Sequence, residues 1–119
     1  MKATVMIIKN KDEILFLLRK TKPFGWCLPG GKLDEGETSK EAIIREVKEE
    51  TQIELNENDI QFVDTKISVS GIEVDIYEVT VDEKPLVTIN KNEHTNKKWL
   101  TKKEVNEIAL AGNTSEFIK

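Results

Sequence analysis

Residues 38–51 limit the possible folds of this chain strongly, because they lack Gly and Pro and are rich in Glu, Lys, Arg and Ala. Thr38 and Glu41 have the spacing of a capping box, in which a hydroxyl and a carboxylate accept hydrogen bonds from free backbone amides of the first turn. This pattern predicts a helix that begins at Thr38 and ends near Thr51. The flanking segments have a different periodicity, so we expect the helix to pack against strands.

Short apolar or alternating runs indicate β-strands in much of the remaining chain. The strands are predicted over residues 2–9, 13–19, 59–70, 72–81 and 97–101. The polar residues 10–12 are expected to turn between the first two strands, and Ser70-Gly71 between the next pair.

Two further segments complete the predicted organisation. The Pro- and Gly-rich residues 20–36 have no helical period, which predicts an ordered loop that crosses a short strand. Thr101 and Glu104 form a second capping box, so a second helix is predicted through about Leu110. Because the strands and the two helices do not alternate as β-α units, the predicted fold class is α+β with a mixed sheet.

Length and charge exclude several classes of protein. A chain of 119 residues is expected to form a single domain, residues 1–119. Its 18 basic and 22 acidic residues leave a net charge of −4, which argues against a domain that grips nucleic acid through its phosphates. One cysteine, Cys27, allows no internal disulfide and no multi-cysteine metal site. Without a long apolar run or a cleavage signal, we expect a cytoplasmic protein with no membrane partner.

Acidic side chains gather on one side of the first predicted helix. At 100° per residue, Glu46, Glu49 and Glu50 share an arc of roughly 100°. The adjoining arc, expected to face the core, carries Ile43, Ile44 and Val47. The opposite arc, expected to face solvent, carries Glu41, Lys48 and Thr51.

This arrangement of acids is consistent with a solvated helix face or with a metal site. Glu46 and Glu50 are a like-charge i,i+4 pair, which costs a few tenths of a kcal/mol unless a cation lies between them. Oxygen ligands without cysteine or a nearby histidine suit Mg²⁺ or Mn²⁺. The pair Gly30-Gly31, a simple turn in the alternative interpretation, lets backbone approach closely and offers the Gly31 carbonyl to the same ion.

An arginine accompanies these acids. Arg45 lies on the flank of the acidic arc, and Glu37 lies just before the helix. Arginine can hold a carboxylate through two hydrogen bonds and so fix its orientation. The alternative for Arg45 is a surface pair with Glu41, one helical turn earlier.

Residues 31–53 resemble the Nudix box, whose pattern is G-x5-E-x7-R-E-U-x-E-E-x-G-U, with U a bulky apolar residue. The matching positions are Gly31, Glu37, Arg45, Glu46, Val47, Glu49, Glu50 and Ile53. Gln52 alone departs from the pattern, because the family has a glycine there that relaxes the left-handed turn after the helix. Gln52 would cost about 1 kcal/mol if it keeps that conformation. It removes no ligand, so it puts local geometry in question more than activity.

The resemblance, to the small MutT-like members, implies an α-β-α sandwich around a mixed sheet and hydrolysis of a nucleoside diphosphate linked to another group. It implies Mg²⁺, for which Mn²⁺ can substitute, held by the Gly31 carbonyl, Glu46, Glu49, Glu50 and Glu93. Glu49 or Glu93 would take the proton from the attacking water. Arg45 would orient the glutamates, and Glu37 would brace Arg45 or bind metal through water.

The resemblance says less about the substrate. Arg19, Lys20 and Lys32 are candidates for phosphate contacts. Asn113 resembles a base-reading asparagine of the family, although it would equally serve as a helix cap. A short chain with this asparagine favours a nucleoside or deoxynucleoside triphosphate, in which the base can be oxidised, cut to the monophosphate and pyrophosphate. ADP-ribose and dinucleoside polyphosphates are the alternatives within the enzyme class.

Another class of function is a nucleotide-binding Nudix module without catalysis. Such modules commonly lose acids of the box, whereas all of those acids are present here. A nucleic-acid substrate is disfavoured because no basic patch is visible. The sequence allows either a monomer or a homodimer.

Several residues near these positions have simpler expected roles. Glu93 has the alternative of a surface acid in a loop, and His94 is expected to be a solvated loop residue. Cys27 is expected to pack as a small residue, since no base accompanies it. The aromatic residues are expected in the core rather than stacked on a base: Phe24, Trp26 and Phe117.

Overall fold

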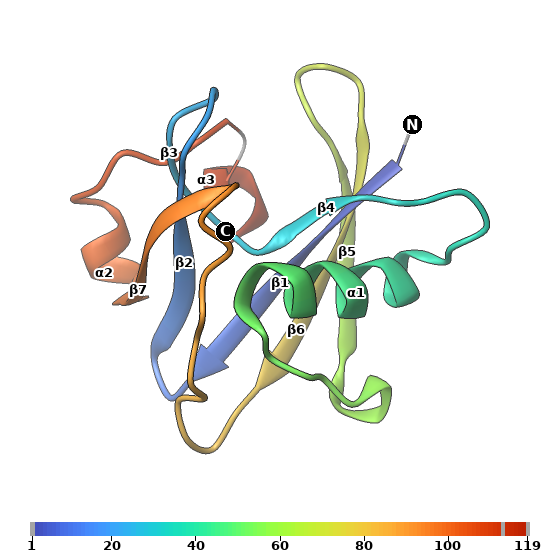
Figure 1. Ribbon diagram of the computed structural model, residues 1–119. Coiled ribbons are helices and arrows are strands. Elements are labelled where there is room, and N and C mark those ends of the chain that lie inside the picture. Colours follow the sequence, from blue (N-terminus) through green and yellow to red (C-terminus); the bar gives the residue numbers. More distant parts are fainter. Residues whose placement is uncertain (1, 113, 119) are drawn as a thin grey trace.

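The computed structural model describes residues 2–112 and 114–118 and forms one mixed sheet with helices on both faces (Figure 1). The strands are β1 (Lys2–Asn10), β2 (Glu13–Arg19), β3 (Gly25–Cys27), β4 (Gly30–Lys32), β5 (Gln61–Ile67), β6 (Glu73–Thr80) and β7 (His94–Thr101). The helices are α1 (Ser39–Thr51), α2 (Lys102–Val105) and α3 (Thr114–Phe117), with a 3₁₀ turn at Glu57–Asp59. The α+β prediction is therefore confirmed.

The sheet forks, and this fork positions the functional site. The strand order is β3-β2-β1-β6-β5, with β1 and β6 parallel. β1 and β2 pair beside their connecting turn, at Lys9 with Ile14 and at Asn10 with Glu13. Farther from that turn β1 pairs with β4, while β2 pairs with β3 and β7. The two strands thus diverge, and the Gly30–Lys32 strand lies on the β1 side of the opening (Figure 1).

Apolar side chains fill both faces of the sheet. One cluster lies under α1 and includes Met6, Leu15 and Tyr77, packed against Ile43 and Val47 of the helix. The other cluster lies on the opposite face. It comprises Ile7, Ile14, Phe16, Trp26, Leu28, Ile76, Leu100 and Val105, with Phe117 and Ile118 packed against it. These two layers hold α1 on one side and the C-terminal segment on the other.

Both ends of α1 follow from local sequence. Thr38 is the N-cap, and its capping box with Glu41 is complete, as predicted. Gln52, at the C-terminal end, has φ 63° and ψ 16°, the left-handed conformation that the family's glycine adopts without strain. Its backbone N–H and its Nε2 both donate to the Lys48 carbonyl, at 2.9 and 3.1 Å. The second hydrogen bond to this carbonyl, from the side chain, offsets part of the backbone cost.

One position of α1 was predicted wrongly. Thr51 is fully buried rather than exposed to solvent. Its Oγ1 donates to the Val47 carbonyl at 2.6 Å and accepts from the Ile53 N–H at 3.2 Å. The hydroxyl thereby satisfies its own polarity inside the structure, which a helical-wheel argument does not anticipate.

The second helix is shorter than predicted, because α2 ends at Val105 rather than near Leu110. The predicted capping box at Thr101 and Glu104 is present. Farther on, the chain leaves the helix and pairs with β3: Trp26 N–H donates to the Ala109 carbonyl, and Ala111 N–H donates to the Trp26 carbonyl, each at 2.9 Å. A tertiary strand contact thus replaces the local helical bonds. No helix in the described ranges is long and apolar enough to cross a membrane.

Candidate active site

A cavity of about 720 Å³ opens at the fork of the sheet. Its walls come from the start of β1, the ends of β2 and β3, β4, α1, the β5–β6 hairpin, the turn before β7 and the C-terminal segment. The acidic side chains that line it are Asp34, Glu46, Glu50 and Glu93. The sequence-predicted box therefore meets the rest of the chain at one concave site.

Arg45 is the centre of the hydrogen-bond network beside this cavity. Its Nε and Nη2 donate to the two carboxylate oxygens of Glu37, at 2.7 and 2.9 Å. Its Nη1 donates to Glu46 Oε1 at 2.7 Å and to both Glu49 oxygens at 3.3 Å. Its Nη2 also donates to the Lys32 carbonyl at 3.2 Å. The guanidinium thus joins α1 to the β4 strand and to the loop before the helix.

This network affects the ionisation of its members. The Arg45 hydrogen bond is the main reason that the pKa of Glu37 is lowered. The hydrogen bond to Glu37 is the main reason that the pKa of Arg45 is raised despite its partial burial, and those to Glu46 and Glu49 add to it. A charged pair with two hydrogen bonds keeps its geometry better than an exposed single contact does. Glu37 therefore holds the Arg45 guanidinium in one orientation.

Glu46 and Glu50 lie side by side at the cavity floor. Glu50 is 4% exposed, and its Oε1 accepts a hydrogen bond from the Gly30 N–H at 3.0 Å. Burial is the main cause that raises the pKa of both carboxyl groups. For Glu50, the nearby acids Glu46 and Glu93 raise the pKa further. Glu93, from the turn before β7, is thus brought close to the box.

Gly31 lets this carboxylate pair sit against the backbone. A Cβ atom at Gly31 would lie 2.7 Å from the carboxyl carbon of Glu46, well inside contact distance. A side chain on this residue would therefore displace Glu46. The absence of a side chain at this position keeps the backbone of β4 available to whatever the carboxylates bind.

The chemistry of this donor set fits a hard divalent cation. Glu50, which is buried, and Glu46, which is partly buried, are unfavourable neighbours with raised pKa values, and a cation between them would remove the repulsion. Glu49 is turned toward Arg45, with its side chain 53% exposed. Among the residues that the structure describes, no three acidic, histidine or cysteine side chains converge on one point. A third carboxylate, from Glu49 or Glu93, would have to turn inward to complete the site.

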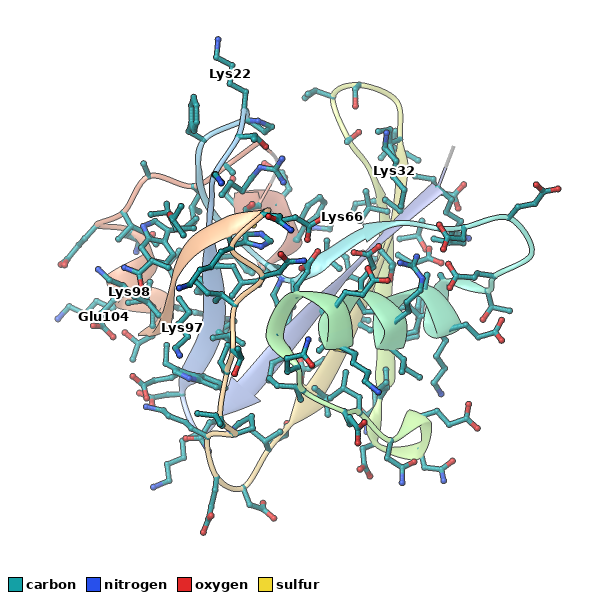
Figure 2. All side chains as sticks on the ribbon, in the orientation of Figure 1. Lys22, Lys32, Lys66, Lys97, Lys98 and Glu104 are labelled. Atoms are coloured by element: carbon teal, nitrogen blue, oxygen red, sulfur yellow. The ribbon has the colours of Figure 1, made fainter. Side chains whose placement is uncertain are left out.

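The predicted substrate-binding residues are only partly brought together. Arg19 and Lys32 line the cavity. Lys20 does not, because its Nζ donates to the Lys91 carbonyl at 3.3 Å on the surface. Lys22, also in this loop, points away from the molecule at the loop tip (Figure 2). Asn113 lies outside the described residues, so its predicted role is not addressed by the structure.

His94 is the residue for which the prediction was most clearly wrong. It is 4% exposed rather than solvated, and it begins β7 opposite Arg19 in β2. Its Nε2 lies 3.8 Å from Cys27 Sγ, and burial lowers the pKa of the imidazole. The strand begins earlier than residue 97 because β7 pairs along all of β2. The sequence signal that could have placed His94 near the site is its position directly after Glu93.

Cys27 agrees with the packing interpretation. Burial, together with the charge of Glu50, raises the pKa of its thiol to about 12, so it stays protonated near neutral pH. Of the aromatic residues expected in the core, Trp26 is buried and Phe117 packs against the second cluster. Phe24 is 62% exposed, so the core prediction is wrong for it. It follows Pro23 in the loop between β2 and β3, where no layer covers it.

A family model described as the NUDIX domain matches residues 1–119, so the chain belongs to the Nudix family. Two curated relatives are similar to part of this chain. The ADP-ribose pyrophosphatase of Methanocaldococcus jannaschii is 51% identical over 47 residues, 38% of this chain and 28% of that protein. A putative 8-oxo-dGTP diphosphatase of Bacillus subtilis is 45% identical over 49 residues, 41% of this chain and 32% of that protein. The matches span about a third or less of these relatives.

Solved structures extend the likeness to the whole fold. The NUDIX domain of Shewanella oneidensis NrtR, complexed with ADP ribose, has a TM-score of 0.84 at 20% identity, covering 99% of this chain and 83% of that one. A MutT NUDIX hydrolase from Burkholderia pseudomallei has a TM-score of 0.79 at 22% identity, covering 98% and 96%. At this identity the likeness establishes the fold, a mixed sheet between helical layers.

Proposed function

We propose that this chain is a Mg²⁺-dependent pyrophosphohydrolase that cleaves a phosphoanhydride bond in a nucleoside diphosphate linked to another group. The observation that carries the proposal is the carboxylate pair of buried Glu50 and partly buried Glu46, held beside Gly30 and Gly31 in a cavity. The names of the relatives support it, because both describe enzymes that act on a diphosphate linkage.

The metal would be held by box residues. Glu46, Glu50, the Gly31 carbonyl and a third carboxylate, Glu49 or Glu93, form an oxygen donor set suited to Mg²⁺ or Mn²⁺. Such an ion neutralises the anhydride and lowers the pKa of bound water. The structure of a bifunctional NMN adenylyltransferase/ADP ribose pyrophosphatase from Francisella tularensis, 28% identical to this chain over 39% of that protein, was solved with AMP and a manganese ion, which supports this choice of cation.

Side chains of the protein would then orient the metal ligands and take the proton from the attacking water. Arg45 fixes Glu46 through its 2.7 Å hydrogen bond, and Glu37 fixes Arg45 in turn. Glu49 and Glu93 are the two candidates for the base that accepts the water proton. Glu49 must first leave Arg45, whereas Glu93 already lines the cavity. Comparing the pH dependence of kcat in Glu49→Gln and Glu93→Gln would identify the base as the residue whose loss abolishes the rise of kcat with pH.

We propose that the substrate is a nucleoside or deoxynucleoside triphosphate, including forms with an oxidised base. It would be cut to the monophosphate and pyrophosphate. Arg19 and Lys32 line the cavity and supply positive charge for a polyphosphate. ADP-ribose is the second candidate, favoured by the 51% identity over 47 residues to an ADP-ribose pyrophosphatase. The cavity is within the size range of sites for ligands of this kind.

A panel of nucleotides tests the proposal. The chain is incubated with Mg²⁺ and nucleoside triphosphates, oxidised dGTP, ADP-ribose or a dinucleoside polyphosphate, and released phosphate, pyrophosphate and nucleotide are identified. Turnover of at least one compound, lost on chelation with EDTA, is the expected result. Absence of turnover on every compound, with binding retained, would instead support a nucleotide-binding module without catalysis.

A further inference from the structure

Three buried side-chain atoms in the described ranges have no hydrogen-bond partner: Thr4 Oγ1, Arg19 Nε and His94 Nδ1. All three residues line the cavity. A buried polar group left unpaired destabilises the folded state, so each such group calls for a physical explanation. Because these atoms gather around one cavity, a ligand that enters it is the natural source of the missing partners.

Two of these residues are neighbours by strand pairing. Arg19 ends β2 and His94 begins β7, and the two are backbone partners where the register shifts after Leu18. Such irregularities re-aim side chains beside functional sites. The charge of Arg19, after burial, contributes to lowering the pKa of His94, which is consistent with their proximity. A guanidinium and a neutral imidazole thus stand together at the end of the sheet.

This basic pair shares the cavity with the carboxylates. His94 Nε2 is 3.8 Å from Cys27 Sγ. Cys27 also lines this cavity, and both Glu50 and Arg19 affect the pKa of its thiol. A group bound at the pair would therefore adjoin a phosphate held at Glu46 and Glu50. The next phosphate of a polyphosphate chain meets this requirement.

We propose that Arg19 and His94 together bind the phosphate next to the one held at the box carboxylates. This inference rests on the proposed function, since it names a subsite of the same cavity. Arginine binds phosphate oxygens as a charged donor. A phosphate oxygen only accepts here, so His94 must carry its ring proton on Nδ1 and accept the Cys27 thiol proton at Nε2.

The Arg19 side chain is placed to admit a ligand. It is partly exposed, and its Nη2 donates a long hydrogen bond of 3.4 Å to the Lys22 carbonyl. An entering phosphate offers a stronger, charged acceptor than this carbonyl. The guanidinium would turn from Lys22 toward the phosphate, which would also accept a hydrogen bond from the buried His94 Nδ1.

Isothermal titration with inorganic pyrophosphate in Mg²⁺ tests the subsite without requiring turnover. His94→Phe keeps a ring but removes the donor, and Arg19→Gln removes the charge. Each variant is expected to bind pyrophosphate about tenfold or more weakly, the loss of one hydrogen bond to a charged group. AMP, which has a single phosphate, should bind each variant within about twofold of the wild type. Ser70→Ala, a polar residue elsewhere on the cavity wall, is the matched control and should bind pyrophosphate normally.

Three outcomes would overturn the inference. The first is no binding of pyrophosphate to the wild type, and the second is unchanged binding in both variants. The third is an equal loss of AMP affinity, which would place the pair against the nucleoside. Circular dichroism reports folding, and His94→Leu, which also lacks a side-chain donor, replaces His94→Phe if the latter does not fold. Because binding is read out directly, a chain that hydrolyses nothing on the panel would still show whether Arg19 and His94 bind phosphate.

Discussion

Arg45 contacts more of the site than any other side chain named in the box. It holds Glu37 through two hydrogen bonds and reaches Glu46, Glu49 and the Lys32 carbonyl from the same guanidinium. A lysine retains the charge but presents donors from a single point. The planar fork is therefore what the network requires.

Arg45→Lys is expected to lower kcat by about 10- to 100-fold, the usual effect of disturbing groups that orient metal ligands. The KM for nucleotide should change less, because Arg45 faces the carboxylates rather than the rest of the cavity. Steady-state kinetics with saturating Mg²⁺ would measure both constants. A variant with normal kcat would show that the glutamates orient themselves without it.

Glu50 predicts a pH dependence of stability in the absence of metal. Its pKa in the folded protein is raised above that of an unfolded carboxyl group. Between the ordinary carboxyl pKa and the raised value, the native state holds a proton that the unfolded state has lost. The contribution of this proton to stability is therefore full below the ordinary carboxyl pKa. This contribution is lost as the pH rises toward the raised value. Glu50→Gln carries no such proton.

Urea denaturation in EDTA at pH 5 and pH 8 would measure this effect. The free energy of unfolding of the wild type should fall between the two pH values by more than that of Glu50→Gln. Adding Mg²⁺ at pH 8 should restore wild-type stability and leave the variant nearly unchanged. Parallel pH dependences in the two proteins would contradict the raised pKa of Glu50 in the folded protein.

At the C-terminal end of α1, a side-chain hydrogen bond partly compensates for a strained backbone conformation. Gln52 adopts the left-handed conformation in place of the family's glycine, and its side chain bonds the Lys48 carbonyl. An exposed hydrogen bond of this kind contributes less than the left-handed backbone costs.

Gln52→Gly should therefore raise the free energy of unfolding by about 0.5–1 kcal/mol. Gln52→Ala is the matched control, since it keeps the strain and loses the side-chain bond, and it should be less stable than the wild type. Equilibrium urea denaturation would compare the three proteins. A glycine variant no more stable than the wild type would mean that the Lys48 contact fully compensates.

Elements with strong local signals could be predicted from the sequence. The capping box located the start of α1, and the apolar run of residues 13–19 has the bounds of β2. The errors lie where distant contacts override local preference. Helix α2 stops early because residues 109–111 pair with β3, and His94 is buried because β7 extends along β2.

The candidate site shows the same division. Spacing along one helix was enough to place the carboxylates together, and the box pattern added Arg45 and Glu37. The pairing of Arg19 with His94 depends on the register between β2 and β7, which no local pattern encodes. The contact between Gly31 and Glu46 likewise depends on β4 pairing with β1 in the fork.

For the molecule as a whole, the excess of acidic over basic residues is explained in part by the carboxylates around the cavity. Several of its carboxylates belong to one cluster around the cavity. Two bound Mg²⁺ ions would bring the formal charge of −4 to about zero before any phosphate arrives. An acidic protein would then bind a polyphosphate through the cations that it holds, together with the basic residues that line the same cavity.

Metal removal should accordingly act on binding as well as on turnover. Titration with a nucleotide in EDTA should show affinity at least about tenfold weaker than in Mg²⁺. Raising the salt concentration should weaken the metal-free binding further, because it then depends more strongly on the charges of Arg19 and Lys32. Equal affinity with and without Mg²⁺ would place the nucleotide away from the carboxylates.

Turnover of the best nucleotide from the panel tests whether the carboxylates of Glu46 and Glu50 support metal-dependent hydrolysis. Wild type and Glu50→Gln are compared in saturating Mg²⁺, with folding verified by circular dichroism. We predict that the variant folds and loses turnover by about 10³-fold or more, as expected when a group that supports a catalytic metal is lost. Near-normal turnover by a folded Glu50→Gln variant would contradict this role for the carboxylates.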